Sequence, residues 1–164
     1  MRSPLDAWIE RLTGIAGPDP AALRRWQVDK LFATARRAAA KSAFHAERLR
    51  DFTARDAKGR PSVTAIPMTT ARHLRDHGEK MLCVSLGDVE RVVTLSTSGT
   101  SGRPKRLYFT AQELEDTMGF FRVGMSTFTR PGDTVLILLP GRRPAGASDL
   151  LASSLPGIGA SGVL

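Results

Sequence analysis

Apolar and polar positions follow a helical period through the first part of the chain. The pattern over residues 5–13 predicts a short helix that ends at Gly14. A longer helix is predicted from Pro20 to about Arg50, because apolar side chains return every three or four positions. This apolar stripe consists of Val28, Leu31, Phe32, Ala35, Ala38, Ala39, Ala46 and Leu49. We therefore expect residues 1–60 to form an N-terminal helical region.

The pattern changes after a predicted loop at Ala54–Pro61. Thr69 or Thr70 is expected to cap a short helix that runs through His77 and ends at Gly78. Short apolar runs beyond it predict strands, and two further stretches have helical spacing. The strands are expected at Val92–Leu95, Leu107–Thr110, Thr134–Leu139 and after Gly159, and the helices at Ala111–Phe128 and Ser148–Leu155.

Residues 61–164 are therefore predicted to be an incomplete α/β subdomain. Strand, helix and strand follow one another after Asp133, which predicts a right-handed βαβ crossover and a parallel sheet. The apolar run Thr134–Leu139 is typical of a strand buried on both faces. The helical stripe before it is expected to face the core, and comprises Leu114, Met118, Phe121, Met125 and Phe128. The predicted fold class is α/β, with N-terminal helices followed by part of a mixed or parallel sheet.

Small and hydroxylated residues fill the segment between the first two predicted strands. The segment reads Thr97-Ser98-Gly99-Thr100-Ser101-Gly102-Arg103-Pro104-Lys105. Its glycines allow close approach to a ligand, its hydroxyl and N–H groups can surround phosphate oxygens, and Lys105 adds a positive charge. The Walker phosphate loop is excluded, because the glycine spacing differs and a strand is predicted to follow. A phosphate-binding loop and a plain hairpin loop or linker both remain open from composition.

The segment from Thr97 to Lys105 resembles the phosphate-binding signature of the adenylate-forming (acyl-activating, AMP-binding) enzymes. Ser101 stands where threonine is commonest in that signature, and it keeps the hydroxyl. The flanking sequences are similar to the phenylacetate–CoA ligase branch of this superfamily, and the resemblance covers roughly residues 30 to 164. These flanks are Ile66-Pro67-Met68-Thr69-Thr70 with His73-Leu74-Arg75, then Tyr108-Phe109-Thr110 with Glu113-Leu114, and Arg130-Pro131-Gly132-Asp133.

The resemblance implies an acid–thiol ligase that uses ATP to activate a small-molecule carboxylate. In such enzymes the carboxylate attacks the α-phosphorus of ATP, pyrophosphate leaves, and a thiol such as CoA captures the acyl-adenylate. Hydroxyl contacts to the phosphates are then expected from Thr97, Ser98, Thr100 and Ser101, and close approach at Gly99 and Gly102. Lys105 is the expected catalytic cation, which offsets charge on the leaving pyrophosphate. Mg²⁺ is expected as the counter-ion of the phosphates.

Enzymes of this branch are expected to be more than twice as long as these 164 residues. The resemblance therefore implies an N-terminal fragment that is inactive alone. The missing C-terminal portion would bind adenine and ribose, hold magnesium and carry the second catalytic lysine. The loop Pro140–Pro144 lacks an aromatic residue, which disfavours an aromatic carboxylate as substrate. A non-catalytic nucleotide-binding remnant stays open as an alternative.

Charge suggests a further alternative, an arginine-rich module that binds nucleic acid. The chain carries 24 Lys+Arg against 16 Asp+Glu, for a formal net charge of +8. The basic residues are spread along the sequence and only 6% of residues are aromatic, so stacking platforms are scarce. We therefore disfavour nucleic acid as a partner. The cations of the predicted long helix are expected to form a solvated face, and are Arg24, Arg25, Lys30, Arg37, Lys41 and Arg48.

Other reactive residues favour structural interpretations. Cys83 is the only cysteine and lies in an apolar run, so it is expected to be a buried small hydrophobe in a reducing compartment. His73 and His77 have a spacing that metal ligands can use, but Leu74 stands where the zincin motif has Glu. We expect solvated histidines at a helix end and no metal site. No signal peptide or apolar span of ~20 residues is present in the sequence, which favours a cytoplasmic protein without a membrane partner.

Overall fold

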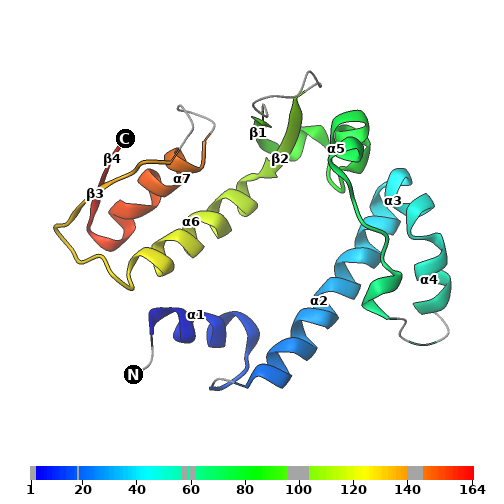
Figure 1. Cartoon of the computed structure of the whole chain (residues 1–164), viewed down its shortest axis with the longest axis horizontal. Helices are drawn as coiled ribbons and strands as arrows, with labels where there is room; N and C mark the ends of the chain where they lie inside the picture. Colours follow the sequence, from blue (N-terminus) through cyan, green and yellow to red (C-terminus); the bar gives the residue numbers. More distant parts are fainter. Residues whose placement is uncertain (1–2, 18, 57–58, 60–61, 96–103, 140–145) are drawn as a thin grey trace. The chain divides into compact units, whose positions relative to one another are not determined.

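The computed structural model describes residues 3–17, 19–56, 59, 62–95, 104–139 and 146–164, which form a mixed α/β protein (Figure 1). This confirms a mixed α/β class, whereas the right-handed βαβ crossover and the incomplete sheet stay predictions. The helices are α1 (Pro4–Thr13), α2 (Pro20–Lys41), α3 (Ala43–Arg48), α4 (Arg50–Asp56), α5 (Ala71–His77), α6 (Ala111–Met125) and α7 (Ala147–Ser154). The strands are β1 (Val89–Leu95), β2 (Lys105–Thr110), β3 (Thr134–Leu136) and β4 (Ser161–Val163). Short 3₁₀ turns are η1 (Val63–Ala65), η2 (Gly78–Met81), η3 (Leu86–Asp88) and η4 (Leu155–Ile158).

The chain divides by packing into two compact units. The central unit is Ala21–Tyr108, and the terminal unit joins Met1–Pro20 to Phe109–Leu164. Each unit has its own hydrophobic core. The division of the sequence into regions 1–60 and 61–164 stays a prediction.

The core of the central unit lies between α2 and the short helices that follow it. Phe32 and Ala35 of α2 are buried against Leu49 and Phe52, as the helical stripe predicts. The rings of Phe32 and Phe52 meet with centroids 5.2 Å apart in a tilted arrangement, which aromatic pairs favour. The cations of α2, at Arg24, Arg25, Lys30, Arg37 and Lys41, are exposed as predicted.

The long helix predicted to reach Arg50 ends earlier, at Lys41. Ser42 has extended backbone angles and caps α3, because its Oγ accepts a hydrogen bond from the N–H of His45 at 3.3 Å. The same Oγ donates to the carbonyl of Lys80 at 2.7 Å. This bond ties the break between α2 and α3 to η2, which is distant in sequence. The predicted loop at 54–61 also begins too early, since α4 continues to Asp56.

The core of the terminal unit lies between α7 and a two-stranded parallel sheet. β3 pairs with β4 in the register Thr134 to Ser161, Val135 to Gly162 and Leu136 to Val163. Ile137 and Leu155 are buried in this core together with Ala160. In addition, α1 packs on α6 within this unit, where the ring centroids of Trp8 and Phe120 lie 5.9 Å apart.

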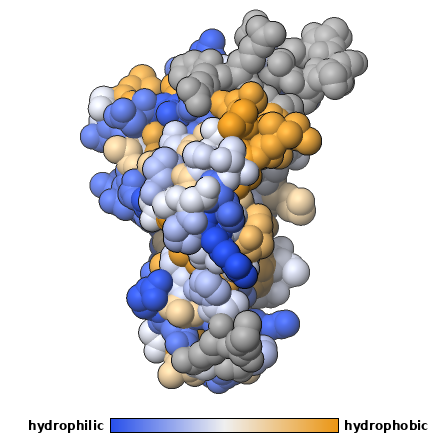
Figure 2. Space-filling model, turned by 90° about the vertical axis from the view of Figure 1, so that its left-hand side faces the viewer, coloured by the Kyte–Doolittle hydropathy of each residue, from blue (hydrophilic) through white to orange (hydrophobic). Residues whose placement is uncertain are grey.

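The prediction that the run Thr134–Leu139 is a strand buried on both faces was wrong. β3 ends at Leu136, and Leu136 and Leu138 are 64% and 83% exposed whereas Ile137 is 5% exposed. The reason is that α7 covers one face of the two-stranded sheet, so the alternate side chains point outward. Figure 2 shows that hydrophobic residues lie at the molecular surface among polar ones, and the exposed fractions place Leu136 and Leu138 among such residues.

Helix α6 is shorter than its apolar stripe suggests. It begins at Thr110, whose Oγ1 accepts from the N–H of Glu113 while the Glu113 carboxylate accepts from the N–H of Thr110. It ends at Met125, and Phe128, expected in the core, is 73% exposed beyond that end. Leu114 is buried as predicted.

Candidate functional site

Lys105 is the one member of the proposed phosphate-binding set that lies within the described residues. Thr97, Ser98, Gly99, Thr100, Ser101 and Gly102 lie outside them. Lys105 is the first residue of β2, which is paired with β1. The segment between Leu95 and Lys105 therefore joins two neighbouring strands, and a strand follows the lysine, as the sequence pattern predicts.

Lys105 and Arg106, the first two residues of β2, face opposite sides of its sheet. Successive residues of a strand face opposite sides of the sheet. Pro104, Arg106 and Tyr108 line one pocket in the central unit, whereas Lys105 does not line it. Lys105 and Arg106 are adjacent in sequence and yet belong to opposite faces of β2. Only Arg106 lines the pocket.

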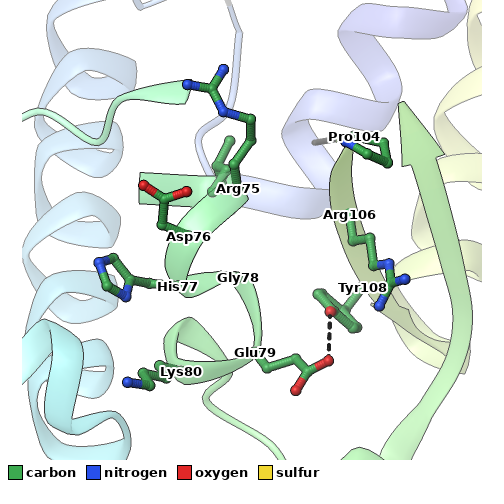
Figure 3. Close-up of a pocket in the computed structure, with 10 residues that line it drawn as sticks. Arg75, Asp76, His77, Gly78, Glu79, Lys80, Pro104, Arg106 and Tyr108 are labelled. Carbon is green, nitrogen blue, oxygen red and sulfur yellow. Dashed lines mark hydrogen bonds between the residues drawn. The ribbon is translucent and has the colours of Figure 1, made fainter. Parts of the chain in front are cut away.

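The pocket beside Arg106 has a volume of roughly 380 Å³ and lies between β2 and the segment formed by α5 and η2. Figure 3 shows Arg106 and Tyr108 on β2 opposite Gly78 and Glu79. The Tyr108 hydroxyl donates to the Glu79 carboxylate over 3.4 Å. A Cβ placed on Gly78 would lie 3.6 Å from the Tyr108 ring, so backbone and ring are nearly in contact.

Local sequence explains how α5 and η2 form this wall. Thr70 caps α5, with its Oγ1 accepting from the N–H of His73 while the Nδ1 of His73 accepts from the N–H of Thr70 at 3.1 Å. Gly78 follows the last residue of α5, as predicted, and its φ of −47° and ψ of −47° are right-handed helical. The chain therefore tightens into η2 at this point instead of reversing.

The pocket presents both signs of charge. Arg75, Lys80 and Arg106 bring positive charge, and Asp76 and Glu79 bring negative charge, and all of these side chains are exposed. Such a lining suits a small polar molecule with both donors and acceptors better than a bare phosphate, which needs converging N–H groups and cations. The pocket consequently lies on the face of β2 that carries Arg106 and Tyr108, and not on the face that carries Lys105.

The histidines expected to be solvated at the end of α5 are instead packed on α3. The rings of His73 and His77 lie with centroids 5.8 Å and 5.3 Å from that of Phe44. Partial burial, followed by the charge of Arg48, lowers the pKa of His73 below its usual value of 6.5, and the same two causes lower the pKa of His45. This contact was missed because Phe44 is distant in sequence.

Two other residue types singled out in the sequence have structural surroundings. Cys83 is half-buried and not fully buried as expected, and its Sγ is a weak donor to the Met81 carbonyl at 3.7 Å. Among the described residues, no group of three or more His, Cys, Asp or Glu side chains could hold a metal ion. The loop at Pro140–Pro144 lies outside the described residues.

Comparison with known proteins adds no family to these observations. No protein-family model matches the chain, and no curated protein matches it. Within the part of the chain that the structure describes, no helix is both long enough and apolar enough to cross a bilayer.

Proposed function

We propose that this chain is the N-terminal part of an ATP-dependent, carboxylate-activating ligase of the adenylate-forming type, similar to acyl-CoA synthetases. The signature at Thr97–Lys105 suggests this chemistry, and the observation that carries it is the position of Lys105 at the start of β2, next to β1. A lysine that leaves a Gly/Ser/Thr loop at a strand end has its ammonium near any phosphate that the loop holds.

In this proposal, the chain supplies the phosphate end of the reaction. Lys105 offsets the negative charge that develops on the leaving pyrophosphate, which lowers the barrier because the cation is positioned in advance. ATP brings Mg²⁺ as a counter-ion to its phosphates, and CoA is the proposed thiol acceptor. Since the described residues offer no acidic cluster for the metal, the magnesium ligand is assigned to the part of the enzyme proposed to follow.

The exposed apolar face of the terminal unit supports the proposal that the subdomain is incomplete. Leu136 and Leu138 on the β3 side and Val163 in β4 are all at least half exposed on a two-stranded sheet. Two strands are rarely stable without further strands or layers. We propose that additional strands and helices of a longer enzyme continue the right-handed βαβ pattern over this face, and that the enzyme works in the cytoplasm.

The test of this function compares ATP binding by the chain with that of two single variants. Lys105→Ala is expected to weaken ATP binding about tenfold, as for the loss of one charge-assisted contact. Arg106→Ala removes the same charge from the next residue, on the opposite face of β2, and is expected to change the affinity less than about twofold. Isothermal titration calorimetry with Mg·ATP provides the affinities.

An equal loss of ATP affinity in the two variants would show that binding depends only on the net charge, and would contradict the role proposed for Lys105. A loss in Arg106→Ala alone would place the nucleotide in the pocket between β2 and α5. Pyrophosphate should compete with ATP, because the loop is proposed to hold the phosphates that leave as pyrophosphate.

The exposed cations of α2 favour nucleic-acid binding as a second candidate function. Arg24, Arg25, Lys30, Arg37 and Lys41 all project into solvent from this one helix. Binding of this kind releases counterions, so its affinity falls steeply with salt and is insensitive to Lys105. A third possibility is a non-catalytic remnant of such a ligase. It would bind ATP as proposed, but it would not turn ATP over even when a C-terminal portion is added.

A further inference from the structure

All three histidines of the chain gather around one phenylalanine in the central unit. The ring of Phe44 on α3 lies 5.3 Å from that of His45, 5.8 Å from that of His73 and 5.3 Å from that of His77, measured between centroids. The guanidinium of Arg48 lies over the same phenylalanine at 5.6 Å. We call these five residues the Phe44 cluster.

The Phe44 cluster joins α3 to the segment Ala71–Met81, which comprises α5 and η2. Two further bonds support the same contact. Ser42 Oγ donates to the Lys80 carbonyl at 2.7 Å, and Arg48 Nη2 donates to the Met68 carbonyl at 2.8 Å. In Figure 3 the His77 ring points away from β2, as its contact with Phe44 requires. The other side of this segment lines the pocket beside Arg106, so the cluster positions one wall of that pocket.

His73 caps α5 through a hydrogen bond that only its neutral form can accept. Its Nδ1 accepts from the N–H of Thr70 at 3.1 Å, and its Nε2 faces the Nη1 of Arg48 at 3.4 Å. Both ring nitrogens therefore face donors. A neutral imidazole has one acceptor nitrogen for such a donor, and an imidazolium has none. Because Nδ1 accepts in the neutral ring, protonation adds an N–H at Nδ1, sets it against the N–H of Thr70 and breaks the capping box of α5.

The surrounding charges act mainly in the same direction. Arg48 from α3 and Arg72 and His77 from α5 all disfavour a positive charge on His73, whereas the Asp76 carboxylate favours it. The N-terminal turn of a helix also repels cations. On the η2 side, the Met81 carbonyl accepts a hydrogen bond from the His45 ring, while Arg48 opposes a charge there too.

We propose that the Phe44 cluster is a pH-sensitive contact, with His73 as its sensor, that releases α5 and η2 from α3 as the solution becomes acidic. The neutral ring caps α5 and packs on Phe44, and the protonated ring does neither. Because Glu79 and Gly78 belong to the released segment and face Tyr108, acidification also loosens the pocket beside Arg106. This inference is independent of the proposed enzymatic function.

The direction of the pH effect follows from linkage. The pKa of His73 is lower in the folded chain than the usual 6.5, so the unfolded segment binds more protons. The docked state is therefore fully stable above about pH 7.5, and it loses stability as the pH falls through 6.5 towards the folded pKa. His45, with its pKa also lowered, adds to the effect with the same sign.

Hydrogen–deuterium exchange of the full chain at pH 7.5 and pH 5.5 tests the proposal, with exchange times scaled to the intrinsic rates. In the wild type, protection of the segment 71–82 is expected to fall at least about threefold at pH 5.5, while α6 is unchanged. His73→Gln keeps an acceptor in the capping box and does not titrate, so it should remove at least half of this fall. His77→Gln is the matched control on the same helix and should retain it.

Two results would overturn the proposal. One is equal protection of 71–82 at both pH values in the wild type, and the other is an undiminished pH effect in His73→Gln. Nitrogen-15 NMR of the three imidazoles gives an independent measurement that needs no variant. His73 is expected to titrate below 6.5, and a His73 pKa at or above that value contradicts the sensor role.

Discussion

Ser42 shows how one polar side chain fixes the path of the chain at the residue scale. It is 5% exposed, it caps α3, and it donates to the Lys80 carbonyl. The serine interrupts a helical stripe that continues on either side of it in the sequence. Buried hydroxyls need hydrogen-bond partners, and the Ser42 hydroxyl has two. It accepts from the N–H of His45 and donates to the carbonyl of Lys80. The break between α2 and α3 is therefore fixed by a contact that no local pattern reveals.

We predict that Ser42→Ala lowers the free energy of unfolding by about 1–2 kcal/mol, because it removes the cap of α3 and the hydrogen bond to the Lys80 carbonyl. Ser62→Ala is the matched control. Ser62 caps η1 at an exposed position, and its loss is expected to change the free energy by about 0.5 kcal/mol or less. Urea unfolding followed by circular dichroism measures both. Equal effects would mean that the bond to Lys80 contributes nothing.

At the scale of elements, tight packing of α7 on β4 holds the terminal unit together. Gly162 lies in β4 opposite Val135, under the helix. A Cβ at this position would lie 3.1 Å from the Cδ1 of both Ile137 and Leu155 and 3.2 Å from the Cα of Ala152. Because the last of these is backbone, the helix itself would have to move. The glycine is thus required by close approach and not by an unusual backbone angle.

Gly162→Ala is accordingly predicted to destabilise the chain by about 1–3 kcal/mol through overpacking. Gly124→Ala, in the same unit, is the control and is predicted to stabilise the chain. Gly124 lies in α6 with open space around its Cα, and alanine there should stabilise by about 0.5–1 kcal/mol. Thermal unfolding of the two variants beside the wild type separates these expectations. A neutral or stabilising Gly162→Ala would show that α7 is not seated on β4 as described.

Sequence patterns predicted those elements whose signals are local. Gly14 ends α1, and Thr70, one of the two threonines expected as the cap, caps α5, because capping depends on residues within one turn. The exposure of Leu138 could not be predicted in this way, since an apolar run is the same whether a second layer covers it or not. The contact of His73 with Phe44 could not be predicted from the sequence either, because it depends on how α5 packs on α3.

The candidate site was only partly accessible from sequence. The signature at Thr97–Lys105 suggested phosphate chemistry, but the pocket between β2 and α5 was not foreseen. The spacing of Pro104, Arg106 and Tyr108 at every second position, which leads into the predicted strand Leu107–Thr110, was the available signal for a shared face. It could not identify the opposite wall, because Gly78 and Glu79 reach β2 through tertiary packing.

At the scale of the whole molecule, the chain has a basic net charge of +8 and a segment, Thr97–Lys105, that is proposed to bind phosphate. Either feature attracts anions, so ATP binding alone does not define the function. The two features differ in specificity. General attraction by exposed cations weakens steeply with salt, whereas a loop that surrounds phosphate oxygens discriminates between one ligand and another at any salt concentration.

The most direct test of the proposed function is the affinity of the chain for ATP and for AMP at 50 mM and 200 mM salt. We predict that ATP binds at least about tenfold more tightly than AMP, since the loop holds the outer phosphates. We also predict that raising the salt weakens ATP binding by less than about threefold. The account would be contradicted by no binding at millimolar ATP, or by a steep loss with salt that a single-stranded oligonucleotide shares.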